Sequence, residues 1–499
     1  MENSVAVAAK STPLGGKIWT NALLFGLIGQ IAWVVENMYF ATFAQKLFED
    51  GAKFGNMYYT ATTLMVIFSA ITATVTTIFM GGLCDKAGKR KPFITIGYLF
   101  WGATIMLFAA IPIDFNTSEG SLIIALLVIF DCIMTFAGST ANDAAFNAWV
   151  ADVTDVTNRG KVNTILSIMP VIATVVTIVI AMFTFDKGDY TMFFIVLGII
   201  PMVTGVLSAF MLKDAPGIVK NTNPNYFKET FYGFRPSVIK GNKMMYVCLS
   251  ALCLIGIAQQ TFMSYLISFV TMTLGITDYL VPLAVVIVLS AAITGGMGVL
   301  FDKFGRKNFY LPLVVVIVLG TLLVYLMDFM PQSAYKPVLY VGGTVMLGSM
   351  LCVAGALTAA FQDYIPKGFE GRFQGVRMCF TVLIPMIIGP IISLIIGINS
   401  FDSKAASATH PPFSIFLAAA IVALLAVIPI IFVRKDADRL RSSLLAKTVS
   451  RPEPNDGAED GCQECAEETV HTSEKSLSAQ EVQTTEVSET DDAPAGKED

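Results

Sequence analysis

Runs of apolar residues, each long enough to cross a lipid bilayer, recur along the whole of this 499-residue chain. A spanning helix needs roughly 20 mostly apolar residues. Because a helix satisfies its own backbone hydrogen bonds, helices are the expected spanning elements, and no strand-rich region interrupts the pattern. The predicted spans are 18–44, 58–82, 92–113, 121–147, 162–184, 190–212, 244–273, 279–301, 309–330, 338–361, 374–398 and 412–433.

The composition agrees with a membrane protein and disfavours an enzyme. Hydrophobic residues make up 55% of the chain and charged residues 14%, whereas soluble domains carry about 25% charged residues. The two histidines, His410 and His471, lie outside the spans, and no phosphate-binding Gly-rich loop with Lys-Ser/Thr occurs. We therefore expect no enzymatic activity, no cofactor and no metal. The tail pair Cys462 and Cys465 supplies too few ligands for a zinc site.

Charge is distributed unevenly between the apolar body and the C-terminal tail. Residues 451–499 hold 15 acidic and 3 basic residues, a local net of −12, which leaves +7 for the rest of a chain whose net charge is −5. A tail rich in Glu, Ser and Thr without aromatic residues is predicted to be disordered from about residue 451. No motif in it indicates a partner. The N-terminus lacks a signal-peptide layout, so the first span is expected to be retained.

The placement of Lys and Arg predicts the orientation. With a cytoplasmic N-terminus, the outer loops carry 5 basic residues and the inner segments 25, not counting the acidic tail. Both termini are thus expected in the cytoplasm, in a multi-pass protein of the plasma or inner membrane. The predicted organisation is a cytoplasmic N-terminus 1–17, a six-helix bundle 18–212, a cytoplasmic loop 213–243, a second six-helix bundle 244–433 and a cytoplasmic tail 434–499.

The two halves of the chain repeat each other. The segment Gly81–Arg90, which reads GGLCDKAGKR, returns at an offset of 217 as GVLFDKFGRK from Gly298. Pro170 and Pro385 are 215 residues apart in the fifth and eleventh spans. Two parallel repeats around a site at the membrane midplane are a transporter architecture.

The doubled loop resembles the signature loop of the major facilitator superfamily. The stretch GKRKPFITIGYLFWG and the segment Asn142–Asp152 further resemble the glycoside–pentoside–hexuronide:cation symporters and their sucrose-transporter relatives. The resemblance implies twelve transmembrane helices in two parallel six-helix repeats. It also implies conformational latches at the cytoplasmic helix ends, namely Asp85, Arg90, Asp152 and Arg159 in the first half and Asp302, Arg306, Asp363 and Arg372 in the second.

Polar residues at membrane depth are costly and so indicate function. In the first span, Gln30, Trp33 and Asn37 share one helical stripe, with Glu36 at its border. Carboxamides and aromatic rings suit sugar recognition, although carboxamides also join helices. The predicted substrate-binding residues are Gln30, Trp33, Glu36, Asn37, Asn142, Asn147, Gln259, Gln260 and Tyr265.

Three carboxylates in the spans are candidates for coupling to a cation: Glu36, Asp131 and Asp143. Such a group can take up and release a proton during a transport cycle. The melibiose-permease branch of the resembling group has acidic residues in its second helix for sodium, whereas this second span has none. The coupling ion is therefore H+ or Na+, with H+ favoured. Arg377 either pairs with a carboxylate or extends to the membrane interface, and the second is slightly favoured.

The predicted function is secondary active transport of a small polar solute, a glycoside or other sugar, by cation symport with alternating access. Two alternatives remain open: a lipid or lysophospholipid transporter of the same fold, and a non-transporting membrane sensor. The expected partners are the small-molecule solute and the lipid bilayer. Nucleic acid is not expected as a partner, and the protein is expected to be a monomer.

Overall fold

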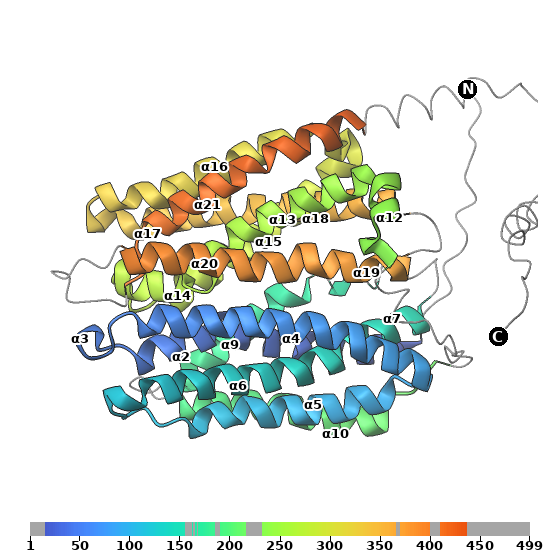
Figure 1. The fold of residues 1–499 in the computed structure, drawn as a ribbon, viewed down its shortest axis with the longest axis horizontal. Helices are drawn as coiled ribbons and strands as arrows, with labels where there is room; N and C mark the ends of the chain where they lie inside the picture. Colours follow the sequence, from blue (N-terminus) through green and yellow to red (C-terminus); the bar gives the residue numbers. More distant parts are fainter. Residues whose placement is uncertain are drawn as a thin grey trace, which may run out of the picture. The chain divides into compact units, whose positions relative to one another are not determined.

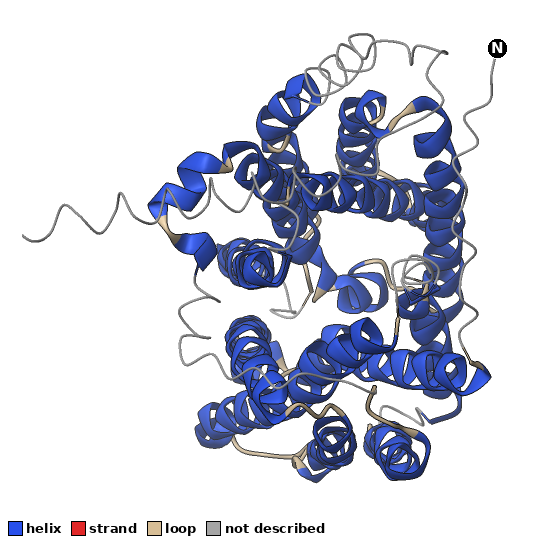
Figure 2. Cartoon of the chain, turned by 90° about the vertical axis from the view of Figure 1, so that its right-hand side faces the viewer, coloured by secondary structure: helices blue, strands red, loops and turns tan. Residues whose placement is uncertain are grey.

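The computed structural model describes residues 15–154, 162, 165–166, 168–184, 190–215, 232–365, 370–399 and 410–436. Within these ranges the side chains of residues 51, 52, 302, 370–372 and 374 are not described. All regular structure in the described ranges is helical (Figure 2). Eleven of the helices found there are long and apolar enough to cross a membrane, and the shorter Met169–Thr184 is also apolar. The prediction of an all-helical membrane protein is confirmed.

The first half of the chain forms one group of packed helices, drawn in blue to green in Figure 1. Its helices are α1 Gly16–Val34, α2 Phe40–Leu47, α3 Gly51–Phe54, α4 Met57–Ala87, α5 Lys91–Leu107, α6 Gly120–Gly138, α7 Asn147–Val153, α9 Met169–Thr184 and α10 Thr191–Met211. Helices α5 and α10 pack closely because Gly102 and Gly198 face each other. A Cβ atom at Gly102 would lie 2.2 Å from the Gly198 carbonyl oxygen.

The second half forms the group drawn in green-yellow to orange in Figure 1. Its helices are α12 Pro236–Gly241, α13 Lys243–Met263, α14 Leu266–Ser268, α15 Leu280–Phe304, α16 Tyr310–Tyr325, α17 Tyr335–Val338, α18 Thr344–Tyr364, α19 Glu370–Met378, α20 Ile384–Asn399 and α21 Ser414–Leu425. The two halves meet where α4 packs on α20 and where α9 packs on α15.

Glycine ends the second helix of each half in the repeated loop. Helix α4 ends before Gly88, whose φ is +63°, and α15 ends before Gly305, whose φ is +82°. These backbone conformations suit glycine, because a Cβ atom is disfavoured at positive φ. The matching spacing of the two loops thus reflects two helix ends of the same kind.

Five spans contain a short π-helical segment: η1 Val35–Tyr39, η4 Ser139–Phe146, η6 Phe269–Thr273, η10 Leu339–Gly343 and η11 Cys379–Leu383. A π-helical turn inserts a residue into the α-helical ladder and often occurs at functional sites. Glu36 and Asn37 lie in η1, and Asn142 and Asp143 lie in η4. The sequence pattern did not predict these interruptions.

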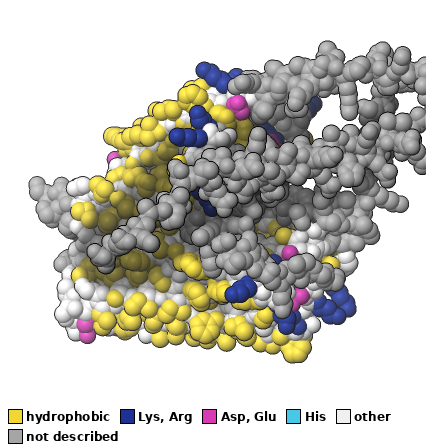
Figure 3. Space-filling model, turned by 45° about the vertical axis from the view of Figure 1, so that its right-hand side comes forward, with side chains coloured by type: hydrophobic (Ala, Val, Ile, Leu, Met, Phe, Trp, Pro, Cys, Tyr) yellow, Lys and Arg dark blue, Asp and Glu magenta, His cyan; other side chains and the backbone are white. Residues whose placement is uncertain are grey.

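The described surface is apolar over a wide area. Hydrophobic side chains cover much of the described surface visible in Figure 3, and only small groups of Lys and Arg side chains interrupt them there. Large apolar residues such as Phe183 and Phe210 are 86% and 80% exposed. A surface of this kind is costly in water and suits contact with lipid chains.

Candidate functional site

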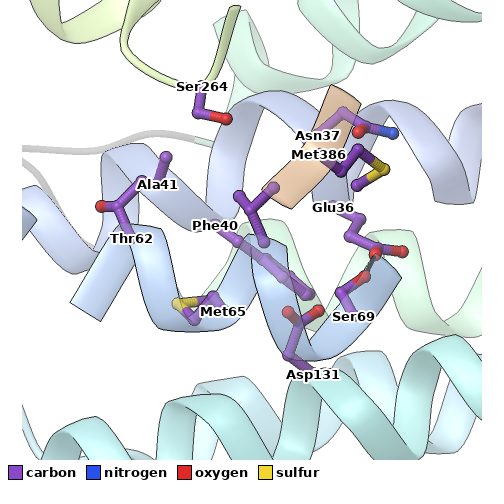
Figure 4. A pocket seen from close by; sticks show the side chains of 11 residues that line it. Glu36, Asn37, Phe40, Ala41, Thr62, Met65, Ser69, Asp131, Ser264 and Met386 are labelled. Carbon is purple, nitrogen blue, oxygen red and sulfur yellow. Dashed lines mark hydrogen bonds between the residues drawn. The ribbon is translucent and has the colours of Figure 1, made fainter. Parts of the chain in front are cut away.

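A small cavity lies where the two halves meet, and it is lined by several of the polar residues selected from the sequence (Figure 4). The first half contributes Glu36 and Asn37 from η1, Thr62 and Ser69 from α4, and Asp131 from α6. The second half contributes Ser264, directly after α13, and Met386 from α20. The cavity volume is about 20 Å³, which is room for one water molecule.

The carboxylate of Glu36 is held by two hydroxyl groups. Its Oε1 accepts hydrogen bonds from the Oγ of Ser69 and, at 3.1 Å, from the Oγ1 of Thr135. The two hydroxyls are themselves 3.1 Å apart. These contacts join the first, second and fourth spans and fix the direction in which the other oxygen, Oε2, points. That oxygen is buried and has no hydrogen-bond partner.

Asp131 is the most enclosed carboxylate of the site, with 2% of its surface exposed. It lines the same cavity as Glu36, and the charges of the two groups repel each other. Its Oδ1 has no hydrogen-bond partner. Glu36 and Asp131 are 95 positions apart in the sequence, so only the packing of α6 against η1 and α4 brings them together.

Asp143 connects the site to the second half of the chain. Its Oδ2 accepts a hydrogen bond of 3.1 Å from the Oγ of Ser139, and its charge interacts with that of Arg377. Arg377 is half-buried near the start of the eleventh span. The charge interaction with Asp143 favours the first expected alternative, in which Arg377 pairs with a carboxylate, and its extension to the membrane interface stays a prediction.

The other predicted substrate-binding residues of the first and fourth spans fall into two environments. Gln30 and Trp33 are partly exposed, and the Trp33 ring packs edge-on against Trp101 with centroids 5.0 Å apart. Asn37 and Asn147 are exposed, and each amide donates to the backbone carbonyl four residues earlier. Asn142 is buried instead and donates to the Tyr98 hydroxyl at 3.0 Å, so it packs between helices.

The predicted substrate-binding residues of the seventh span also lie in different environments. Gln259 and Gln260 are partly buried, and Gln260 packs directly on Gly389 of α20. Tyr265 is fully buried in a cluster of tyrosines and does not line the cavity. Its ring centroid is 5.7 Å from that of Tyr58 and 5.6 Å from that of Tyr59. The structure thus brings Glu36, Asn37 and Asp131 together at the cavity and places Asn142 and Tyr265 elsewhere.

Uncharged hydrogen bonds join the two halves at the predicted outer end. The Tyr58 hydroxyl donates to Ser268 at 3.0 Å, and the Tyr59 hydroxyl donates to the His410 carbonyl at 2.9 Å. Thr63 contacts the Tyr265 hydroxyl at 3.4 Å. Burial lowers the pKa of the His410 side chain, which favours its neutral form. Sequence reasoning missed these contacts, although the Tyr58-Tyr59 pair at a span end was a visible signal. The hydrogen bonds of Tyr58 and Tyr59 to Ser268 and His410 are called the tyrosine gate below.

At the opposite end, basic residues of the repeated loop pair with Asp residues at the end of the fourth and tenth spans. Arg90 contacts Asp85 at 2.7 Å and Asp152 at 2.9 Å. Arg306 contacts Asp363 at 2.7 Å in the second half. Burial acts to lower the pKa of Arg90, but its hydrogen bonds to Asp152 and Asp85 outweigh burial, and the pKa is raised.

Three of the predicted latch residues are not placed. Arg159 lies outside the described residues, and the side chains of Asp302 and Arg372 are not described. One further contact was missed: Asp214 accepts hydrogen bonds from the backbone N–H groups of Arg90 and Lys91, at 2.7 and 2.9 Å, and so caps the start of α5. Among the described residues, no group of three or more metal-ligating side chains occurs.

Comparison with known proteins identifies the fold. The sequence profile of the Major Facilitator Superfamily matches residues 18–390. Among solved structures, a D-xylose–proton symporter has 13% sequence identity and a TM-score of 0.65, covering 82% of this chain and 97% of that one. A bacterial homologue of the human lysosomal transporter Spinster has 11% identity and a TM-score of 0.62, covering 84% and 97%. The nucleoside transporter NupG has 13% identity and a TM-score of 0.59, covering 83% and 98%. No curated protein sequence matches the chain.

Proposed function

The chain belongs to the major facilitator superfamily of secondary transporters, and from this premise we propose that it moves a small polar solute, a glycoside or other sugar, together with a cation. The observation that carries the proposal is the grouping of carboxylates and a carboxamide at the junction of the two halves, with Glu36, Asn37 and Asp131 on one cavity. Ionisable groups at membrane depth persist when transport requires them.

The solute class follows from the side chains along the first span. Gln30, Trp33 and Asn37 keep exposed surface, and Asn37 lines the cavity together with Glu36 and Asp131. An aromatic face packs on the apolar face of a sugar ring, and carboxamides donate to and accept from its hydroxyls. This chemistry also supports the proposed place of the protein in the glycoside–pentoside–hexuronide:cation group.

A proton is favoured over sodium as the coupling ion. The second span carries no carboxylate between residues 58 and 82, and its polar groups at the cavity are the hydroxyls of Thr62 and Ser69. The carboxylates that remain, Glu36, Asp131 and Asp143, are groups that a proton can neutralise before the halves move. We expect both termini to be cytoplasmic, so the tyrosine gate closes the outer end in this conformation.

A lipid cargo is the second candidate, and one feature bears on it. An apolar groove on α4, α5 and α6 is lined by Met80, Phe93, Ile96, Phe100 and Phe136, among others. None of its lining residues belongs to the central cavity. The groove therefore favours contact with bilayer lipid over a path for a transported acyl chain.

Substitution of the carboxylates tests the proposal. In proteoliposomes with an inward pH gradient, we expect the protein to accumulate its sugar, and Glu36→Gln and Asp143→Asn to lose accumulation while retaining exchange. Asp114→Asn is the matched control, because Asp114 is an exposed carboxylate away from the cavity lining. If Glu36→Gln and Asp143→Asn both keep accumulation and its pH dependence, these carboxylates do not couple transport to a cation.

A further inference from the structure

A groove lies where the start of α1 meets the ends of α7 and α10, far from the middle of the spans. Its volume is about 700 Å³, and it shares no lining residue with the central cavity. Pockets of this size hold organic ligands in other proteins. The predicted orientation places these helix ends at the cytoplasmic face of the membrane, so the groove lies where lipid headgroups meet water.

Buried hydrogen bonds fix one wall of the groove. The Trp149 indole N–H of α7 donates to the Lys213 carbonyl at 2.9 Å, and the Asn21 amide of α1 donates to the Met211 carbonyl at 3.2 Å. Both donors are buried and both line the groove. They hold the chain that leaves α10 against α1 and α7, so the groove is built by packed helices rather than by an exposed loop.

The charges in the groove favour an anionic ligand. The side chains of Lys17 and Lys213 line it and are exposed, and neither amine pairs with another residue in the described part of the chain. Asp214 is the acidic residue of the lining. Its carboxylate already accepts hydrogen bonds from the backbone N–H groups of Arg90 and Lys91. Two amines therefore remain available to a negatively charged group, and basic pockets between spans bind lipid headgroups.

Apolar side chains beside the amines indicate that the ligand also has a hydrocarbon part. Phe210 is 80% exposed, and Met211 and Ile18 are partly exposed in the same groove. A free phosphate ion or an acidic peptide segment would use the amines and leave Phe210 without a role. A phospholipid uses both, because its phosphate lies at the membrane surface and its acyl chains lie directly below.

We propose that this groove binds one anionic phospholipid from the leaflet on the predicted cytoplasmic side. The phosphate contacts the amines of Lys17 and Lys213, and an acyl chain packs on Phe210. The bound lipid joins α1 to the end of α10, which are both in the first half of the chain, and so stabilises that half. Binding therefore requires neither the solute nor the cation of the proposed function.

The test is thermal unfolding of the purified full-length protein in detergent, with added phosphatidylglycerol or phosphatidylcholine of the same acyl chains. A ligand of the folded state raises the midpoint, and we expect phosphatidylglycerol to do so at concentrations where phosphatidylcholine does not. An amine near an anionic lipid contributes about fivefold to affinity. The double variant Lys17→Gln/Lys213→Gln should therefore need about 25-fold more phosphatidylglycerol for the same shift. Lys17→Arg/Lys213→Arg should keep the response.

The matched control is Lys240→Gln/Lys243→Gln, which removes two exposed lysines outside the groove. Lys240 belongs to α12, which Figure 1 shows at the same end of the helices as α7. We expect this control to respond like the unsubstituted protein, and Phe210→Ser to bind phosphatidylglycerol several-fold more weakly.

Four results would overturn the lipid site. Phosphatidylcholine could act as strongly as phosphatidylglycerol, or the two Lys→Gln double variants could respond alike. Inorganic phosphate could raise the midpoint as strongly as the lipid, which would make the ligand a free anion. Finally, the unsubstituted protein could show no response to phosphatidylglycerol. None of these results depends on solute uptake, so the lipid site and the proposed function stand or fall separately.

Discussion

The repeated loop offers a comparison of the same ion pair in two environments. Arg90 is buried, with 7% of its side chain exposed, and contacts two Asp residues whose side chains are 33% and 26% exposed. Arg306 is 35% exposed and contacts one Asp that is 63% exposed. Replacing each Arg by Gln retains much of the side-chain stem and removes the charge. The two variants therefore differ mainly in how deeply the Asp carboxylates that lose their cation are buried.

The cost of each replacement follows from burial. Removing one partner of a buried ion pair costs about 3–5 kcal/mol, and the partial exposure of Asp85 and Asp152 lowers this to about 2 kcal/mol for Arg90→Gln. An exposed pair contributes about 0–1 kcal/mol, so Arg306→Gln should cost about 0.5 kcal/mol. The difference of about 1.5 kcal/mol corresponds to a few degrees in Tm.

Thermal unfolding of the two purified variants measures this difference directly. We expect Arg90→Gln to unfold several degrees below Arg306→Gln, and Asp152→Asn to recover part of the loss in the Arg90→Gln background, because it removes a carboxylate that lacks its cation. Equal midpoints for the two Arg variants, or no loss for Arg90→Gln, would refute the reasoning from burial.

Two further substitutions test a contact between the halves and a contact within the first half. Tyr58→Phe removes the hydroxyl that donates to Ser268 and keeps the ring, so we expect the predicted outer end to open about 2–10-fold more often, measured as the labelling rate of a cysteine placed beside the gate. No change in labelling would count against the gate. Gly102→Val forces a side chain against the Gly198 carbonyl and should abolish folded protein in size-exclusion chromatography, whereas Gly295→Ala, which meets open space, should not. Normal folding of Gly102→Val would contradict the close approach of α5 and α10.

The helical architecture was predictable from the sequence because its signal is local. Twenty apolar residues in a row are visible without knowledge of any neighbour, and the repeated loop marks the same helix end twice. The pairing of Arg90 with Asp152 and of Arg306 with Asp363 also matches residues chosen from the repeat. Their action as latches and the boundaries of the two bundles stay predictions.

The contacts of the central site were not predictable in the same way. The spans are apolar on most sides, so the sequence does not fix how each helix is rotated about its axis. The π-helical turns at Glu36 and Asp143 change that rotation locally. For this reason the sequence pointed to Asp131 and Arg377 as notable residues, but it did not indicate that Asp131 shares a cavity with Glu36 or that the charge of Arg377 acts on Asp143.

The central claim, cation-coupled transport of a sugar, is tested most directly by uptake into proteoliposomes. Radiolabelled mono- and disaccharides are offered with an imposed pH or sodium gradient while the membrane potential is clamped. We predict that a sugar accumulates above its external concentration under an inward gradient, and that accumulation disappears with the gradient and in Glu36→Gln. Uptake that only equilibrates, with or without a gradient, or the absence of uptake of every sugar would contradict the account.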